Sequence, residues 1–299
     1  MSTPSDLPST TVREHSGDGW ELIKLPPKSR PKASAGPAHV LKHHPIGDRY
    51  MALSLHAPKI AATAQPGQFL MLTAARQNQK TPALPRPMAI YSLDADSGVV
   101  EVLYGVVGHG TRQLAGFAVG EDMFVVGPLG RCFEVAQDAC SVLLIGRGIG
   151  TCSLTTVAQD NARRGIPTIA VTSARDRTSS IGGDFYRQHG VRQVYEVTDA
   201  DGTSTPEALW ETLTQDLDAH PPAIIMTCGS DRLTRLCERL AQRWGSSVQV
   251  SVEAHMACGL GYCHGCASGA RSEGDESPLI CNDGPVFSWQ PAHSEMVSS

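Results

Sequence analysis

Met256-Ala-Cys-Gly-Leu-Gly-Tyr-Cys-His-Gly-Cys266 is the stretch around which this chain is organised, and one more cysteine follows it. Glycine tolerates positive φ at little cost, so this glycine-rich loop can curl around a metal and turn its amides towards the sulfurs. The spacing C-x4-C-x2-C-x14-C is typical of plant-type [2Fe–2S] ligation and differs from the paired knuckles of structural zinc. We therefore expect a [2Fe–2S] cluster, with a four-cysteine zinc site or unligated thiols as alternatives. The expected ligands are Cys258, Cys263, Cys266 and Cys281.

The bulk composition limits the class of protein. A length of 299 residues suggests two or three compact units, and 41% hydrophobic residues are ordinary for a globular chain. The net charge of −5, without blocks of like charge, gives no sign of a nucleic-acid or membrane-surface partner. No apolar run approaches the roughly 20 residues of a membrane span, and the polar N-terminus lacks the apolar region of a secretory signal. The five remaining cysteines are scattered singly, which fits a reducing cytoplasm.

The first half of the chain has the pattern of an antiparallel β domain. Residues 1–36 are polar and rich in Ser, Thr and Pro, so we expect a disordered extension there. Residues 37–137 contain short alternating runs separated by Gly, Pro and Asp, which predict a small antiparallel barrel. The expected strands are His39–Lys42, Tyr50–Leu55, Gln68–Leu72, Met88–Leu93, Val99–Val107 and Met123–Val126.

The pattern changes in residues 138–250, which predict a doubly wound α/β domain. Short apolar runs with little alternation are typical of parallel strands that are buried on both faces. Helical stretches separate them, the clearest being Asp231–Trp244 with Ser230 as its cap, and Pro206–Leu217. Residues 251–290 form the expected cluster lobe, and residues 291–299 a flexible tail. The expected strands are Val142–Gly146, Thr168–Ser173, Val194–Thr198, Ala223–Gly229 and Val248–Val252.

Two glycine-containing turns have the residues of an anion site. Val107-Gly-His-Gly-Thr111 follows a predicted strand and opens a helix, whose first amides suit a pyrophosphate. Gly146-Arg-Gly-Ile-Gly150 likewise stands between a strand and a helix, where glycines let a phosphate approach the backbone. Thr227-Cys-Gly-Ser230 ends a later strand at the same expected edge of the sheet. Each of these, taken alone, is also compatible with an ordinary structural turn.

The order of these motifs resembles that of the ferredoxin-reductase-like flavoproteins. The chain shows R-P-x-x-I from Arg86, then G-x-G-T, G-P-L-G, G-x-G-I-G, C-G and the four cysteines. Within that group it most resembles the electron-transfer subunit of bacterial dihydroorotate dehydrogenase, from about residue 38 to Phe287. The resemblance implies an FAD-binding barrel, an NAD(P)-binding α/β domain and a C-terminal [2Fe–2S] lobe.

The resemblance also implies binding residues. FAD is expected at Arg86, Pro87, Met88, Ala89, Leu103, Tyr104, Gly105, Gly110 and Thr111. The nicotinamide nucleotide is expected at Gly146, Gly148, Ile149, Gly150, Thr151, Arg175, Cys228 and Gly229. No residue suggests a substrate pocket with its own acid and base, so we expect no catalytic side chain.

Four residues depart from the pattern of the family. Ala89 replaces a usual serine near the flavin, Arg147 replaces a glycine, and Ser153 and Ser230 replace prolines. The last three surround the expected nicotinamide site. We therefore expect altered or weakened nucleotide binding, without a decision between NADH and NADPH.

The expected function is an electron relay from NAD(P)H through FAD to the [2Fe–2S] cluster and on to a partner subunit. The resemblance implies a flavin- and iron–sulfur-dependent oxidoreductase complex of pyrimidine biosynthesis, a hetero-oligomer whose partner is an FMN-containing dihydroorotate dehydrogenase. One alternative is a reductase that serves an oxygenase, demethylase, hydrogenase or sulfite reductase, or a soluble carrier. Another is a non-catalytic redox-sensing or assembly subunit.

Overall fold

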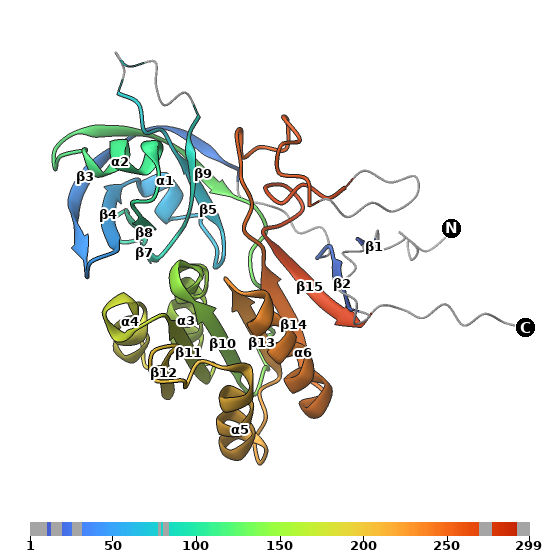
Figure 1. The fold of residues 1–299 in the computed structure, drawn as a ribbon. Coiled ribbons are helices and arrows are strands. Elements are labelled where there is room, and N and C mark those ends of the chain that lie inside the picture. The colour runs from blue at the N-terminus through green and yellow to red at the C-terminus, as the bar shows by residue number, and fades with distance from the viewer. Residues whose placement is uncertain are drawn as a thin grey trace, which may run out of the picture.

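Two β-sheets, one antiparallel and one mostly parallel, lie one above the other in this protein (Figure 1). The computed structural model describes residues 11–12, 20–25, 32–76, 79, 84–268 and 277–291. The cysteine-rich segment lies beside both sheets in Figure 1, where it is drawn in orange-red. This arrangement brings the three expected functional parts of the chain together.

The upper sheet is an antiparallel half-barrel, as the alternating sequence pattern predicts. Its strand order is β6-β5-β9-β3-β4-β8-β7, and the side chains of Val40, Leu53, Leu70 and Val102 fill its interior with 0% exposure. Two short helices, α1 (Pro58–Ala61) and α2 (His109–Ala115), close its ends. The strands are β3 (Ser34–Ile46), β4 (Tyr50–His56), β5 (Phe69–Leu72), β6 (Arg86–Ala89), β7 (Ser92–Asp94), β8 (Val99–Gly105) and β9 (Asp122–Leu129).

The lower sheet contains the predicted parallel strands in the order β14-β13-β10-β11-β12. The chain leaves β10 towards β11 on one side and returns to β13 on the other, so the sheet has a topological switch point between β10 and β13. In open α/β sheets, ligands bind at the carboxyl ends of the strands at such a point. The strands are β10 (Val142–Arg147), β11 (Thr168–Ala174), β12 (Gln193–Thr198), β13 (Ile224–Cys228) and β14 (Ser247–Ser251).

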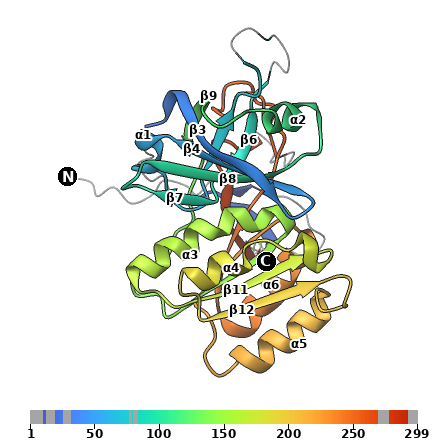
Figure 2. The ribbon, with the colours of Figure 1, turned by 90° about the vertical axis from the view of Figure 1, so that its left-hand side faces the viewer.

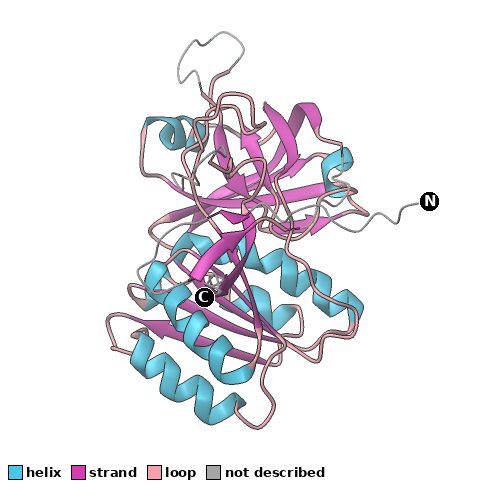
Figure 3. Cartoon of the chain, turned by 90° about the vertical axis from the view of Figure 1, so that its right-hand side faces the viewer, coloured by secondary structure: helices cyan, strands magenta, loops and turns pink. Residues whose placement is uncertain are grey.

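Helices cover both faces of this sheet (Figures 2 and 3). Successive residues of a strand point to opposite faces, and β10 follows this rule: Leu144 packs with residues of α3, whereas Leu143 and Ile145 pack with residues of α5 and α6. Both faces are therefore apolar, which explains why these strands show little alternation. The helices are α3 (Cys152–Arg164), α4 (Gly183–Gln188), α5 (Pro206–Leu217) and α6 (Asp231–Trp244), with short turns η1 (Gly148–Thr151) and η2 (Arg177–Ser179).

Part of the N-terminal stretch expected to be disordered is built into the lower sheet. β2 (Trp20–Ile23) pairs with β15 (Val286–Pro291), and β1 (Thr11–Val12) pairs with β2. Leu22 is only 1% exposed, because it joins the apolar core of this sheet. The first barrel strand also begins earlier than expected, at Ser34. Residues 1–10, 13–19 and 26–31 of the expected extension lie outside the described residues, as do residues 292–299 of the expected tail.

The cysteine-rich segment leaves the lower sheet and returns to it. It follows β14, and β15 then pairs antiparallel with β14, with Ser251 opposite Val286. Two isolated bridges, Arg131 with Pro285 and Ala267 with Leu279, fix the segment to the barrel side and to itself. We call residues 252–285 the iron–sulfur lobe. Within the described part of the chain, no helix is long and apolar enough to span a membrane.

Candidate functional site

A pocket with a volume of about 250 Å³ lies where the barrel, the α/β domain and the iron–sulfur lobe meet. All three parts contribute to its walls, and its surface is more apolar than polar. Eight of the residues expected at FAD or the nucleotide line it. These are Pro87, Met88, Ala89, Leu103, Tyr104, Gly105, Thr111 and Ile149.

Arg86 and Gly110 lie together beside the pocket. A Cβ atom at position 110 would overlap the Arg86 guanidinium, so glycine is what lets the side chain lie against the start of α2. Arg86 Nη1 donates to the carbonyls of Leu84, at 2.9 Å, and Pro85, at 3.2 Å. Among the described residues these are its only hydrogen-bond partners, and none is a carboxylate. Its charge is therefore available to an anion.

Thr111 shapes the turn that opens α2. Its hydroxyl oxygen accepts from the backbone N–H groups of Val107, at 2.9 Å, and Gly108, at 3.0 Å. The first N–H groups of a helix have no partner inside the helix. With the Arg86 guanidinium beside them, they form a cradle that suits a pyrophosphate. The residues expected at FAD fit such a group.

The second glycine turn closes tightly on the neighbouring strand. A Cβ atom at Gly150 would lie 2.8 Å from the carbonyl oxygen of Cys228 and from the Cα of Gly229. Gly229 adopts φ +99° and in turn packs against the carbonyl of Arg147. The carboxyl ends of β10 and β13 are thus in direct contact at the switch point, with Gly146 and Gly148 in the same turn. Thr151 is buried in η1 and follows this turn.

Several residues of the pocket wall were not among the expected binding residues. Cys152, Ser153 and Glu253 line the pocket, and Cys228 lies behind them. The Cys228 sulfur is 3.6 Å from Ser153 Oγ and 4.0 Å from Glu253 Oε1. Burial raises the pKa of the Cys228 thiol to about 12 and also raises the pKa values of Cys152 and Glu253. Both thiols are therefore neutral near pH 7.

The available signal for Glu253 was its position. It follows directly after a predicted parallel strand, and the carboxyl ends of such strands meet at the ligand-binding edge. Cys152 gave no such signal, because a single cysteine at the start of a helix is as often a small buried apolar residue.

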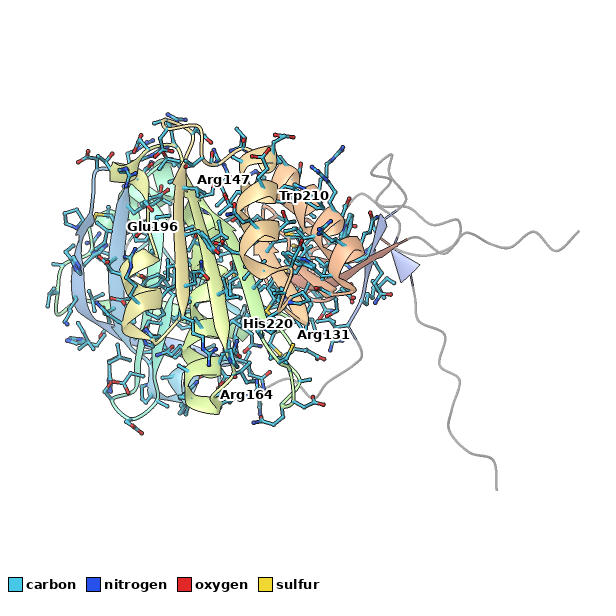
Figure 4. The ribbon with its side chains drawn as sticks, turned by 90° about the horizontal axis from the view of Figure 1, so that it is seen from below. Arg131, Arg147, Arg164, Glu196, Trp210 and His220 are labelled. Atoms are coloured by element: carbon cyan, nitrogen blue, oxygen red, sulfur yellow. The ribbon has the colours of Figure 1, made fainter. Side chains whose placement is uncertain are left out.

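Arg147 does not point into the pocket but lies along the carboxyl edge of the sheet. Its guanidinium donates to Ser173, at 2.9 Å, and to both carboxylate oxygens of Asp199, at 3.2 and 2.6 Å. Figure 4 shows it at one edge of the sheet, while Arg164 and His220 lie towards the opposite edge. Arg175 follows β11 with an exposed side chain and takes no part in the described hydrogen bonds of this group.

The four cysteines of the iron–sulfur lobe come from two segments of one loop. Cys258, Cys263 and Cys266 lie in the first segment and Cys281 in the second. The Cys258 sulfur accepts from the N–H groups of Leu260 and Cys263, both at 3.4 Å. Burial raises the pKa of the Cys258 thiol, but these N–H groups bring it down to about 7. Amides that point at sulfur stabilise the thiolate, which is the form that binds iron.

Cys281 and Cys266 also accept from backbone N–H groups, although burial raises the pKa of the Cys281 thiol. Cys281 Sγ accepts from Gly261 N at 3.1 Å and lies 3.2 Å from Cys266 Sγ, while Cys281 N donates to Cys266 Sγ at 3.4 Å. In the described chain, no three His, Cys, Asp or Glu side chains converge on a single metal ion. Four cysteine thiolates are the ligand set of a [2Fe–2S] cluster, and the residues present fit that group.

The lobe contacts the barrel and the pocket. Gly259, at φ +70°, packs so closely on Met71 of β5 that a Cβ there would overlap its side chain. A few residues earlier in the loop, Ala254 and Met256 line the pocket. The lobe thus connects the four thiols with the wall of the pocket.

Comparison with known proteins identifies a known domain in the C-terminal part of the chain. Residues 253–291 match the family model for the iron–sulfur cluster binding domain of dihydroorotate dehydrogenase B. The electron transfer subunit of dihydroorotate dehydrogenase B (NAD(+)) from Listeria monocytogenes is 28% identical over 250 residues, 83% of this chain and 94% of that one. The corresponding subunit from Desulforamulus reducens is 29% identical over 256 residues, 85% of this chain and 96% of that one.

Solved structures share the fold. An NADH-dependent reduced ferredoxin-NADP oxidoreductase, described for flavin-based electron bifurcation, superposes with a TM-score of 0.69 at 23% identity, covering 85% of this chain and 88% of that one. A ferredoxin reductase of carbazole 1,9a-dioxygenase superposes with a TM-score of 0.56 at 19% identity, covering 71% and 66%. The resemblance indicated by the motifs is thus confirmed: the chain is related to the electron-transfer subunits of bacterial dihydroorotate dehydrogenase B and has a ferredoxin-reductase-like fold.

Proposed function

We propose that this chain is the electron-transfer subunit of an oxidoreductase complex, passing electrons between NAD(P)H, FAD, a [2Fe–2S] cluster and a partner redox subunit. The observation that carries the proposal is the single pocket bordered by the barrel, the glycine turn after β10 and the iron–sulfur lobe. A flavin ring held there would touch the nicotinamide site on one side and the cluster lobe on the other. Bound FAD would supply the exchange between two-electron and one-electron transfer.

The barrel residues bind and orient the flavin nucleotide. Arg86 and the first turn of α2 hold the pyrophosphate by charge and by backbone N–H donors. Ala89, Leu103 and Tyr104 form an apolar wall against the ring and exclude water from it. Ala89 offers no hydroxyl to the flavin, in contrast to the serine usual at this position.

The glycine turn after β10 receives the nicotinamide nucleotide at the switch point of the sheet. Gly146, Gly148 and Gly150 let the pyrophosphate approach the backbone. Glu253 lines the pocket at the expected nicotinamide position, and Cys228 lies behind it. The buried Cys228 thiol remains neutral. These groups position the ring; none of them is an acid–base pair for an organic substrate.

The iron–sulfur lobe binds the cluster through Cys258, Cys263, Cys266 and Cys281. Cys263 is exposed, and the neighbouring Leu260 and Tyr262 are 56% and 90% exposed. Large exposed apolar side chains around an electron-transfer centre are suited to a protein partner. The partner we propose is an FMN-containing catalytic subunit of the dihydroorotate dehydrogenase type, in a hetero-oligomer. None of the nine cysteines forms a disulfide, which supports a location in a reducing cytoplasm.

Anaerobic titration of the purified protein with NADH and NADPH tests the relay. We expect flavin and [2Fe–2S] absorbance bands, bleaching of both by a reduced nucleotide, and co-purification of an FMN-containing subunit from the native cell. Cys263→Ser is the matched variant: it should lose the cluster band and keep the flavin band and its reduction. Zinc in place of iron, or absence of flavin, would contradict the relay. Co-purification of an oxygenase or another reductase would keep the relay and change its partner.

A further inference from the structure

A single carboxylate, Asp199, is surrounded by donors at the carboxyl edge of the sheet. Arg147 Nη2 donates to its Oδ2 at 2.6 Å, and Arg147 Nη1 to its Oδ1 at 3.2 Å. Arg232 Nη2 donates to Oδ1 at 2.7 Å, and the hydroxyl of Ser204 donates to the same oxygen. Asp199 follows β12, Arg147 ends β10 and Arg232 lies in the first turn of α6. We call Arg147, Asp199 and Arg232 the edge cluster.

The donors around Asp199 are unevenly placed: three of them point at Oδ1 and one at Oδ2. A carboxylate has about four lone-pair positions, and four N–H or O–H groups already point at this one. Arg147, Ser204 and Arg232 also hold the pKa of Asp199 far below its usual range, so it stays ionised. Nucleotide domains that bind NAD use an acidic side chain to accept the ribose 2′-hydroxyl. Asp199 has one acceptor position left, on Oδ2, and its negative charge is already shared by two guanidinium groups.

The edge cluster offers donors and positive charge instead. A guanidinium has several N–H donors and no acceptor. Arg232 uses one terminal nitrogen for Asp199, and its remaining donors belong to a side chain that is 40% exposed. Two guanidinium groups share one carboxylate, so the edge cluster is positive. The neighbouring pair of Arg177 and Asp201 is neutral in sum.

The edge cluster also lies within reach of a bound dinucleotide. Arg147 belongs to the glycine turn, and Ile149, Cys152 and Ser153 on the other side of that turn line the pocket. A dinucleotide with its nicotinamide at the pocket and its pyrophosphate at the turn would extend its adenosine along the carboxyl edge towards β12. Figure 4 shows Arg147 at this edge, near the ends of the strands.

We infer that the edge cluster selects a dinucleotide whose adenosine carries a 2′-phosphate, so that this subunit uses NADPH in preference to NADH. The inference rests on the proposed function, because it names the nucleotide of the same site. A phosphate monoester matches a pair of guanidinium groups, whereas a neutral ribose diol gains little from their positive charge.

Binding of two adenosine fragments to the holoprotein tests the inference. Isothermal titration with 2′,5′-ADP and with 5′-AMP compares the same ligand with and without the 2′-phosphate. We expect 2′,5′-ADP to bind at least about tenfold more tightly, and Arg147→Gly and Arg232→Gln each to remove most of that difference. Arg243→Gln is the matched control, since it removes one arginine at the far end of α6, where it pairs with Asp218. Retained flavin and cluster bands show that each variant is folded.

The outcomes separate the inference from the proposed function. If 5′-AMP binds as tightly as 2′,5′-ADP, or if the Arg147 and Arg232 variants behave like the Arg243 control, the inference is wrong. NADH would still reduce the flavin in that case, and the relay would stand. If neither fragment binds and neither dinucleotide reduces the flavin, both the nucleotide part of the relay and the inference fail.

Discussion

Two arginines stand beside glycine turns in this molecule, and they differ in how their charge is compensated. Arg86, on the barrel, donates to two backbone carbonyls and to no described carboxylate. Arg147, on the α/β domain, is paired with Asp199 through both terminal nitrogens. An uncompensated guanidinium attracts an anion strongly, whereas a paired one is fixed in place and discriminates by geometry. The comparison predicts that Arg86 determines affinity and Arg147 determines selectivity.

Removing Arg86 should have the largest effect. Arg86→Gln deletes the uncompensated charge beside α2, so we expect FAD to bind about 100-fold more weakly, because a charge-assisted bidentate contact is lost. The flavin content after purification and the dissociation constant for added FAD measure this. Arg112→Gln, on the exposed side of α2, is the control and should keep its flavin. Equal loss in both variants would show that helix charge in general, not the Arg86 position, holds FAD.

Gly150→Ala should weaken the nucleotide site of the α/β domain and leave the FAD site of the barrel intact. The added Cβ would lie 2.8 Å from the backbone of Cys228 and Gly229, so the turn must move away from β13. We expect reduction of the flavin by either dinucleotide to slow about tenfold or more, because the phosphate site is displaced. The flavin band should remain. Stopped-flow measurement of flavin reduction gives the rate. If the variant lost FAD as well as the rate, the nucleotide site and the FAD site would not be independent.

Asp199→Asn should reduce stability in a pH-dependent way. The pKa of Asp199 is lowered in the fold, so its contribution to stability is present above its ordinary value of 3.8 and is lost as pH falls through the lowered value. The side chain is 37% exposed and screened by solvent, so we expect a loss of roughly 1 kcal/mol, about 3 °C in Tm, near pH 7. The difference from wild type should shrink below about pH 4. A constant difference would show that charge is not its source.

Glu253→Gln should have the smallest effect. Burial raises the pKa of Glu253, so the folded protein favours the neutral carboxyl, and the cost of the carboxylate grows as pH rises above the ordinary value of 4.5. The variant should therefore match wild type at low pH and become slightly more stable than wild type towards about pH 8. Thermal unfolding of the flavin-free protein at several pH values measures this. A variant that is less stable at high pH would show that the carboxylate has a favourable partner.

Local patterns allowed most of the two domains to be predicted. The predicted bounds of Asp231–Trp244 and Pro206–Leu217 are those of α6 and α5, because caps and apolar spacing are local signals. The parallel strands were found within about two residues for the same reason. β2 was missed, because its partner β15 is far away in the sequence and no local pattern gives that pairing.

The residues of the candidate site could be predicted where they belong to a local motif. They could not be predicted where only the folded chain brings them together. Four cysteines with a fixed spacing and two glycine turns indicated the cluster and the phosphate sites. Arg147 was noticed as a departure, but its partner Asp199 lies 52 residues away and belongs to another strand. Glu253 and Cys152 likewise meet at the pocket only because β14 ends and α3 begins there. Contacts of this kind depend on the register of the whole sheet, which no single stretch contains.

The pairing of Ser251 with Val286 makes the iron–sulfur lobe, in topological terms, the loop of a β-hairpin. Its two ends are neighbours on adjacent strands, so the pairing of β14 with β15 is independent of how many residues lie between them. The lobe nevertheless belongs to the core, because Cys266, Ile280 and Cys281 pack with the buried residues of the lower sheet. The same geometry lets an insertion carry a redox site without interrupting the strand order of the sheet.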